Sequence, residues 1–147
     1  MSTDVKPSLT LERRLNAAPA KVFSAWTDPK KIGRWFCPVT CEPVLAESDA
    51  RVGGRYRIVV RAQSGEEHDV SGTFREIVPN RKLVFTWAWR TTPERESLVT
   101  VELAPDGDGT MLTLTHDRFF DEAARDRHRS GWRPLLDRLD EMLPVLD

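Results

Sequence analysis

Apolar and polar residues alternate along several segments of the chain, which is the pattern of half-buried β-strands. The segments predicted as strands are 9–16, 56–60, 70–78, 83–89, 99–103 and 111–116. Short turn sequences, among them Ser64-Gly65-Glu66 and Pro79-Asn80, separate the last five of them. Consecutive strands joined by such turns pair with their neighbours, so the sequence predicts an antiparallel meander.

Helical spacing appears in two other parts of the chain. After the first strand, Pro19 opens a short helix, and Asp28-Pro29 ends it and starts a second one that reaches Ile32. From about Asp121 onward, large apolar residues recur every three or four positions, as on one face of a long helix. These residues are Trp132, Leu135, Leu136, Leu139, Met142 and Leu143. We expect a kink in this helix near 131–134, where it contains a glycine and a proline.

The strand at 83–89 places four large apolar side chains on one face, namely Leu83, Phe85, Trp87 and Trp89. This face and the apolar face of the long helix need each other for burial. Strand twist accumulates across a sheet, so six to seven strands can curl around the helix. The predicted fold class is therefore α+β, with two short helices after strand one and a curved antiparallel sheet wrapped around a C-terminal helix. We expect a flexible segment at 1–8 and a single domain over 9–147.

Charge and composition narrow the class of partner. The chain of 147 residues has 22 basic and 23 acidic side chains, a net charge of -1, and no long run of either sign. Nucleic-acid grooves and anionic-membrane patches need clustered Lys and Arg, so we expect neither partner. The chain begins without a secretory signal and has no apolar stretch long enough to span a membrane. We expect a cytoplasmic monomer or homodimer whose partner is a small molecule or another protein.

The cysteines and turn acids do not indicate a metal or cofactor. Cys37 and Cys41 have three residues between them and no second pair accompanies them, so we expect two free thiols in a loop rather than a disulfide framework or a zinc site. The turn at 106–109 resembles a calcium loop only superficially, because the bidentate Glu is missing. His68 lies in the wrong strand region to complete a metal site.

Two histidines are the candidate polar groups of an internal cavity. His116 shares its strand face with Leu112 and Leu114, and His128 shares its helix face with Trp132. The pair could line one end of a cavity and orient a ligand. Alternatively, His116 is a neutral core histidine with its own partners, and His128 caps the exposed end of the helix.

Large rings could form the floor of such a cavity or simply fill it. The full set of candidate ligand-binding residues is Trp35, Phe36, Tyr56, Ile58, Phe74, Phe85, Trp87, Trp89, Leu112, Leu114, His116, His128 and Trp132. We predict an enclosed or single-mouthed pocket between sheet and helix of about 300–1,000 Å³, the range usual for ligand sites.

The chain resembles a known family through the ordered motifs FSAWTDPKKIGRWF, RVGGRYR, GTFREIVPNRKLVFTW, GTMLTLTH and GW. Over residues 9–143 it is similar to the domain homologous to the activator of the ninety-kilodalton heat-shock chaperone's ATPase, within the START-like or SRPBCC superfamily. The resemblance implies a helix-grip fold with a cavity that takes hydrophobic ligands in relatives. The eukaryotic co-chaperone has an additional N-terminal domain, for which 147 residues leave no room, so we do not expect chaperone activation.

Three functions follow as hypotheses. The first is binding of a small hydrophobic or aromatic ligand without catalysis. The second is a stress-response or chaperone-accessory role, which needs an exposed apolar patch. The third is a cyclase- or hydrolase-type enzyme that uses His116 or His128. No Ser, Cys or Asp has a spacing that completes a nucleophilic arrangement with either histidine, so the first hypothesis is favoured.

Overall fold

The computed structural model describes residues 6–37 and 41–146 of the chain. The predicted flexible segment 1–8 lies mostly outside the described residues. In chain order the elements are β1 (Leu9–Leu15), α1 (Pro19–Thr27), α2 (Pro29–Trp35), β2 (Cys41–Ser48), β3 (Arg55–Ala62), β4 (Glu67–Val78), β5 (Lys82–Trp89), β6 (Ser97–Asp106), β7 (Gly109–Asp117), α3 (Glu122–Met142) and the 3-10 helix η1 (Leu143–Val145).

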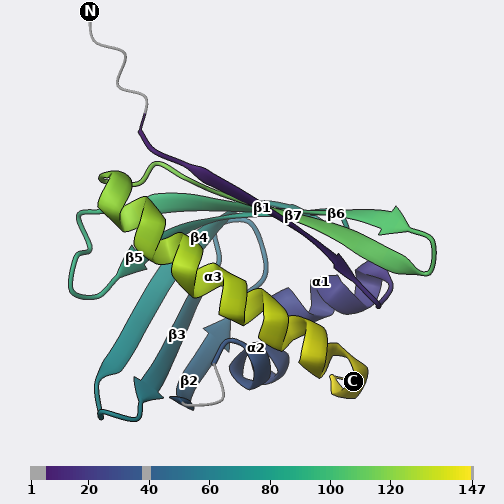
Figure 1. Ribbon diagram of the computed structural model, residues 1–147, viewed down its shortest axis with the longest axis horizontal. Coiled ribbons are helices and arrows are strands. Elements are labelled where there is room, and N and C mark those ends of the chain that lie inside the picture. Colours follow the sequence, from purple (N-terminus) through teal and green to yellow (C-terminus); the bar gives the residue numbers. More distant parts are fainter. Residues whose placement is uncertain (1–5, 38–40, 147) are drawn as a thin grey trace, which may run out of the picture.

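The strands form one antiparallel sheet of seven strands in the order β1-β7-β6-β5-β4-β3-β2. The strands from β2 to β7 follow one another as a meander, and β1 returns to pair with β7. The sheet is curved, and α3 runs diagonally across it, with α2 beside the C-terminal half of α3 (Figure 1). This arrangement confirms the predicted helix-grip architecture.

One strand of the seven, β2, was not located by the sequence pattern. It is the edge strand that pairs with β3, and its register shifts between Pro43 and Leu45. None of its residues is fully buried. An edge strand accepts proline and does not need one continuous buried face, so the alternation that marks the other strands is absent from it.

The long helix α3 closes the concave side of the sheet. Asp121 is its N-cap and accepts a hydrogen bond from the Ala124 backbone N–H at 2.8 Å. The helix continues through both Gly131 and Pro134. Its buried side chains are Ala124, Trp132, Leu136 and Leu139. On its outer side, Arg13 of β1 forms ion pairs with Asp137 and Asp140, which tie the helix to the edge of the sheet.

The backbones of β4 and β5 approach each other closely at Gly72. A Cβ atom on Gly72 of β4 would lie only 1.9 Å from the Thr86 carbonyl oxygen and 2.8 Å from the Tyr56 ring. The Tyr56 hydroxyl donates a hydrogen bond to that same carbonyl oxygen. Glycine is therefore required at 72, because any side chain would displace backbone atoms of β5.

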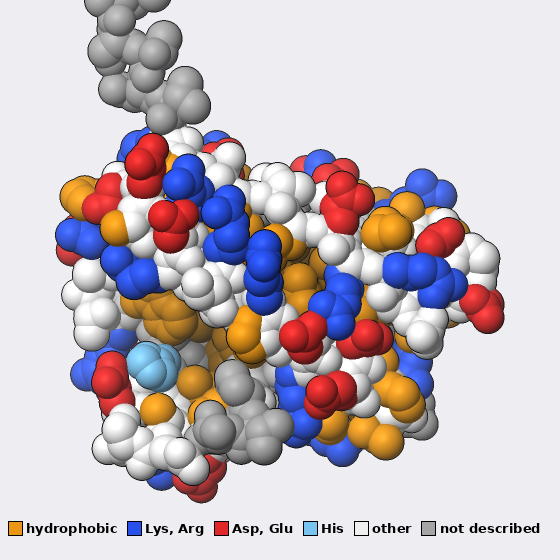
Figure 2. All heavy atoms as spheres, in the orientation of Figure 1, with side chains coloured by type: hydrophobic (Ala, Val, Ile, Leu, Met, Phe, Trp, Pro, Cys, Tyr) orange, Lys and Arg blue, Asp and Glu red, His pale blue; other side chains and the backbone are white. Residues whose placement is uncertain are grey.

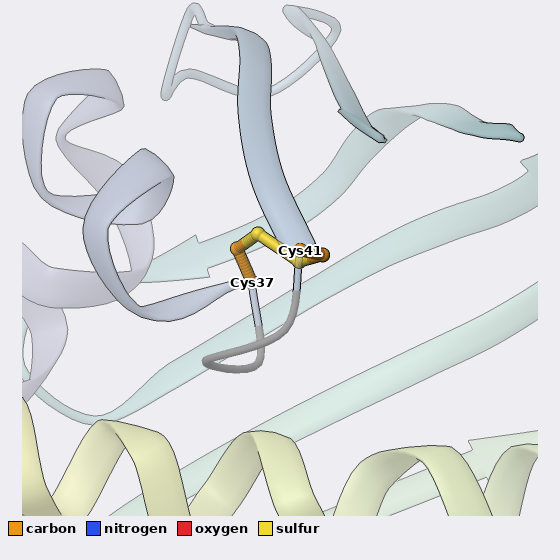
Figure 3. The surroundings of a disulfide bond; sticks show 2 residues. All are labelled: Cys37 and Cys41. Atoms are coloured by element: carbon orange, nitrogen blue, oxygen red, sulfur yellow. A yellow bond between two sulfur atoms is a disulfide. The ribbon is translucent and has the colours of Figure 1, made fainter. Parts of the chain in front are cut away.

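The expectation of two free thiols is wrong. Cys37, which follows α2, and Cys41, the first residue of β2, form a disulfide bond (Figure 3). Their Cα atoms lie 5.7 Å apart, within the range that a disulfide requires. The spacing of two cysteines alone does not show whether they pair. The bond connects the end of α2 directly to the edge strand.

Candidate functional site

A groove of about 490 Å³ opens between the N-terminal half of α3 and the adjoining strands β4 and β5. Figure 2 shows it as a hollow beneath α3, bordered by apolar side chains and a histidine. The residues that line the groove are Phe36, Glu66, His68, Trp87, Trp89, Arg127, His128, Gly131, Trp132 and Leu135. The floor is aromatic, whereas Glu66, His68 and Arg127 supply polar and charged groups. The volume falls within the predicted range, but the space is an open groove and not an enclosed pocket.

A second, much smaller cavity of about 30 Å³ lies deeper in the core. Its lining consists of Trp26, Ile32, Trp35, Phe36, Tyr56, Ile58, Phe74, Phe85 and Trp87. Such a volume accepts a water-sized group and no more. The interior between sheet and helix is therefore filled mainly by rings. Phe36 and Trp87 line both spaces, with ring centroids 5.8 Å apart, so they form the partition between groove and inner cavity.

His128 lies at the groove with both ring nitrogens engaged. Its Nε2 accepts hydrogen bonds from the indole N–H groups of Trp89 at 2.9 Å and Trp87 at 3.3 Å. An indole nitrogen only donates, so the proton of the neutral ring resides on Nδ1, which donates to the Ala124 carbonyl oxygen at 2.7 Å. Burial is the main cause that lowers the pKa of His128, and the positive charge of Arg127 lowers it further. The neutral ring of His128 thus holds two tryptophan side chains in place through hydrogen bonds.

His116 is fully buried and has a complete set of partners. Its Nδ1 accepts a hydrogen bond from the Trp132 indole N–H at 3.0 Å, so its proton is on Nε2. That Nε2–H donates to the Ser97 hydroxyl oxygen at 2.7 Å, and the hydroxyl donates to the Trp87 carbonyl oxygen at 3.2 Å. Burial, with a smaller effect of His128, lowers the pKa of His116 to about 2.

The Ser97–His116 contact is not a nucleophile and its base. A serine nucleophile needs a histidine nitrogen that accepts its proton, whereas the Nε2 of His116 already carries one and donates it toward Ser97. Both side chains are also buried away from the groove. The sequence spacing did not indicate this contact because Ser97 and His116 meet across the paired strands β6 and β7.

The structure brings the predicted pair of histidines together, with ring centroids of His116 and His128 5.0 Å apart. Most of the candidate ligand-binding residues line one of the two spaces. Trp35, Phe36, Tyr56, Ile58, Phe74, Phe85 and Trp87 line the inner cavity, and Phe36, Trp87, Trp89, His128 and Trp132 line the groove. Leu112, Leu114 and His116 line neither space. Whether any of these residues contacts a ligand stays a prediction.

Several lining residues are not among those predicted from the sequence. Trp26 and Ile32 line the inner cavity, and Glu66, His68, Arg127, Gly131 and Leu135 line the groove. Trp26 and Leu135 carried a signal, because each falls on the apolar face of its helix. His68 and Gly131 carried none, since their approach depends on where α3 crosses the sheet. Within residues 6–37 and 41–146, no group of three His, Cys, Asp or Glu side chains is arranged to hold a metal ion.

Comparison with known families now adds to this geometry. The family model described as "Activator of Hsp90 ATPase homolog 1-like protein" matches residues 16–144, which includes α1, α2, the sheet from β2 to β7 and α3. The chain belongs to this family. As the resemblance implied, the fold and the order of motifs are those of a START-like domain. None of the described helices is long and apolar enough to cross a membrane.

Individual relatives support the assignment. The human activator of 90 kDa heat shock protein ATPase homolog 1 is 22% identical over 125 residues, which cover 85% of this chain. The matched part amounts to 33% of that human protein, so the chain spans about a third of its length. Its activity therefore does not transfer directly to this family member.

Solved structures agree with the fold. An AHSA1 protein from Silicibacter pomeroyi is 28% identical with a TM-score of 0.83, covering 95% of this chain and 99% of that one. A protein from Rhizobium leguminosarum is 30% identical with a TM-score of 0.79, covering 94% of both chains. CalU16 from Micromonospora echinospora is 31% identical with a TM-score of 0.71, covering 94% of this chain and 76% of its own.

Proposed function

We propose that this protein binds a small hydrophobic molecule with an aromatic part in the groove between α3 and the sheet. The observation that carries the proposal is the groove itself, whose volume of about 490 Å³ is walled by Trp87, Trp89 and Trp132. Of the groove's apolar side chains, Trp89 and Leu135 are partly exposed and offer contact area to a ligand, whereas Trp87 and Trp132 are 3% and 1% exposed and lie behind that surface. Phe36 and Leu135 complete the apolar wall.

The polar groups of the groove select among such ligands. His128 has no free hydrogen-bonding atom, because both ring nitrogens are engaged. Polar contacts to a ligand therefore come from Arg127, His68 and Glu66 at the rim. These side chains fix the orientation of a ligand whose apolar body lies on the tryptophans. The same hydrogen bonds give no support to catalysis by His116 or His128.

A substitution that fills the groove tests this proposal. No atom lies within 4 Å of a Cβ atom built on Gly131, which lines the groove, so we expect Gly131→Leu to be tolerated and its side chain to occupy part of the groove. We expect wild-type protein to bind a naphthalene derivative saturably, with affinity in the micromolar range or tighter, and Gly131→Leu to weaken binding about tenfold or more.

The matched control is Arg133→Leu, which adds the same side chain at an exposed position of α3 that does not line the groove. It should bind as wild type does in the same fluorescence titration. Equal weakening by the two variants, or the absence of saturable binding to wild-type protein, would contradict the proposal.

A chaperone-accessory role is the second candidate, and family membership is the observation that favours it. The direct test adds the purified protein to a ninety-kilodalton chaperone from the same organism and measures ATP hydrolysis. A reproducible, saturable rise in rate supports the role, and an unchanged rate opposes it.

We also propose a cytoplasmic location. The Cys37–Cys41 bond argues against this location, because disulfides persist mainly in oxidising compartments. Thiol labelling of the protein in intact and fractionated cells measures both its location and whether Cys37 and Cys41 are oxidised there.

A further inference from the structure

A second pocket, of about 240 Å³, lies beside the groove, and Trp89 and His128 line both spaces. We call it the arginine pocket. The other lining side chains that solvent reaches are Thr91, Thr92, Arg95, Phe120 and Arg127. No Asp or Glu among the described residues lines it, since Glu94 and Glu96, which flank Arg95, lie outside the lining. The pocket is therefore open to solvent and carries positive charge on its wall.

The two arginines of this pocket have no carboxylate partner. Neither Arg95 nor Arg127 forms an ion pair within residues 6–37 and 41–146. By contrast, Arg125 and Arg129 on the same stretch of α3 both pair with Asp126. Both pocket arginines are exposed, so their guanidinium groups are free to turn toward a bound anion.

Arg95 is held against an aromatic wall of the pocket. Its guanidinium carbon lies 3.9 Å from the ring centroid of Phe120. A guanidinium stacked on a ring keeps the N–H donors at its edge available for a carboxylate. Phe120 is still 58% exposed, and Trp89 is partly exposed, so both rings retain surface for an apolar group. The pocket thus combines cationic donors with aromatic surface.

We infer that the arginine pocket binds a small aromatic carboxylate, whose charged group pairs with Arg95 and Arg127 and whose ring packs on Trp89 and Phe120. A carboxylate gains charge-assisted hydrogen bonds that a neutral amide or ketone does not. The volume lies below the about 300 Å³ at which sites for drug-sized ligands begin, so it suits a compound with one ring. This site is separate from the proposed ligand site in the groove and does not depend on it.

Three probes test the inference on the complete chain. Benzoate carries the ring and the charge, benzamide keeps the ring without the charge, and acetate keeps the charge without the ring. We expect benzoate to bind saturably, with a dissociation constant in the millimolar range or below, and the other two to bind about tenfold more weakly. A larger preference is not expected, because water and salt screen exposed arginines. Shifts of ¹⁵N-labelled backbone and indole signals measure the affinities.

Arg95→Gln is the main variant, because Arg95 lines this pocket and not the groove. It should weaken benzoate about fivefold and leave binding of the acetyl derivative of naphthalene in the groove unchanged. Arg133→Gln removes the same charge from an exposed position outside both spaces, so it should bind benzoate as wild type does.

Gly131→Leu separates the two sites, because Gly131 lines the groove alone. It should weaken the naphthalene probe and leave benzoate unaffected. Benzoate affinity equal to that of benzamide or acetate overturns the inference, as does equal weakening of benzoate by Arg95→Gln and Arg133→Gln. Loss of benzoate binding in Gly131→Leu also overturns it, since benzoate would then occupy the groove. If only the naphthalene probe fails to bind wild-type protein, the proposed function fails and the arginine pocket stands.

Discussion

Tryptophan indole groups determine the protonation of both core histidines. Trp132 fixes the tautomer of His116, and Trp87 and Trp89 together fix that of His128. Every ring nitrogen of the two histidines is therefore paired while the rings are neutral. Protonating either ring would place a second N–H against an indole N–H in a buried site.

This arrangement predicts a pH-dependent stability. The pKa of His116 is lowered from 6.5 to about 2 in the folded protein, so the unfolded chain takes up the proton first as the pH falls. The contribution of His116 is thus fully present above pH 6.5 and is lost progressively below it. Between pH 7.5 and pH 5.5 we expect the free energy of unfolding to decrease by about 1.4 kcal/mol from this residue alone. Urea unfolding at both pH values measures it.

His116→Gln supplies the comparison for this experiment. Glutamine keeps a donor and an acceptor but does not titrate, so the stability of the variant should be less sensitive to pH than that of wild type. If wild type and His116→Gln lose the same free energy between the two pH values, His116 is not the titrating group.

The glycines provide a second prediction at this scale. Gly72→Ala places a Cβ against the Thr86 carbonyl group, so we expect a loss of about 3 kcal/mol or failure to fold. Gly131→Ala meets no atom within 4 Å and should stabilise α3 by about 1 kcal/mol, because alanine favours the helix. Chemical denaturation of both variants measures these changes in the free energy of unfolding. Similar effects of the two would contradict the close packing at 72.

The parity of strand residues was enough to predict that His116 points inward with Leu112 and Leu114, all of which are buried. It could not predict the partners of His116, because Ser97 comes from another strand and Trp132 from α3. Side-chain periodicity defines a face, whereas hydrogen-bond partners depend on how distant elements are placed.

At the scale of elements, α3 depends on a few side chains for its attachment to the sheet. Leu139 is fully buried, and its neighbours on the same face, Leu136 and Trp132, are 3% and 1% exposed. Together they cover the concave face of the sheet. Since the groove needs α3 as its upper wall, these residues also maintain the candidate site.

We therefore expect Leu139→Ala to lower the free energy of unfolding by about 2–5 kcal/mol, the range found when a buried leucine is truncated. Glu141→Ala, on the exposed side of the same helix, should change it by less than about 0.5 kcal/mol. Thermal or urea unfolding of both variants tests this. Equal, small effects would show that α3 is not packed as described.

The disulfide between Cys37 and Cys41 links two elements, α2 and β2. It closes a short loop between α2 and β2, and short loops gain little from cross-linking. We expect the double variant Cys37→Ser, Cys41→Ser to lose at most about 2 kcal/mol of stability and to keep the fold. Denaturation with and without a reductant measures the effect. A loss of stability well above this value would mean that the bond also stabilises structure outside the short loop that it closes.

Patterns along the chain located the helices and all strands but β2, because buried faces leave a periodic signal and an exposed edge leaves none. At the scale of the whole molecule, they also predicted an enclosed or single-mouthed pocket between sheet and helix. They could not indicate how far the side chains fill that space. Rings fill most of the enclosed interior, and the larger space is a groove open along the N-terminal half of α3.

The central claim is that this groove is a ligand site, and the tryptophans allow a direct measurement of it. The chain has five tryptophans, so a ¹⁵N-labelled sample gives five indole N–H signals. On titration with the acetyl derivative of naphthalene, we predict that the signals of Trp87, Trp89 and Trp132 shift with one common dissociation constant, and that Gly131→Leu suppresses these shifts. Shifts confined to residues elsewhere on the surface, or no shift of these three signals at saturating probe, would contradict the account.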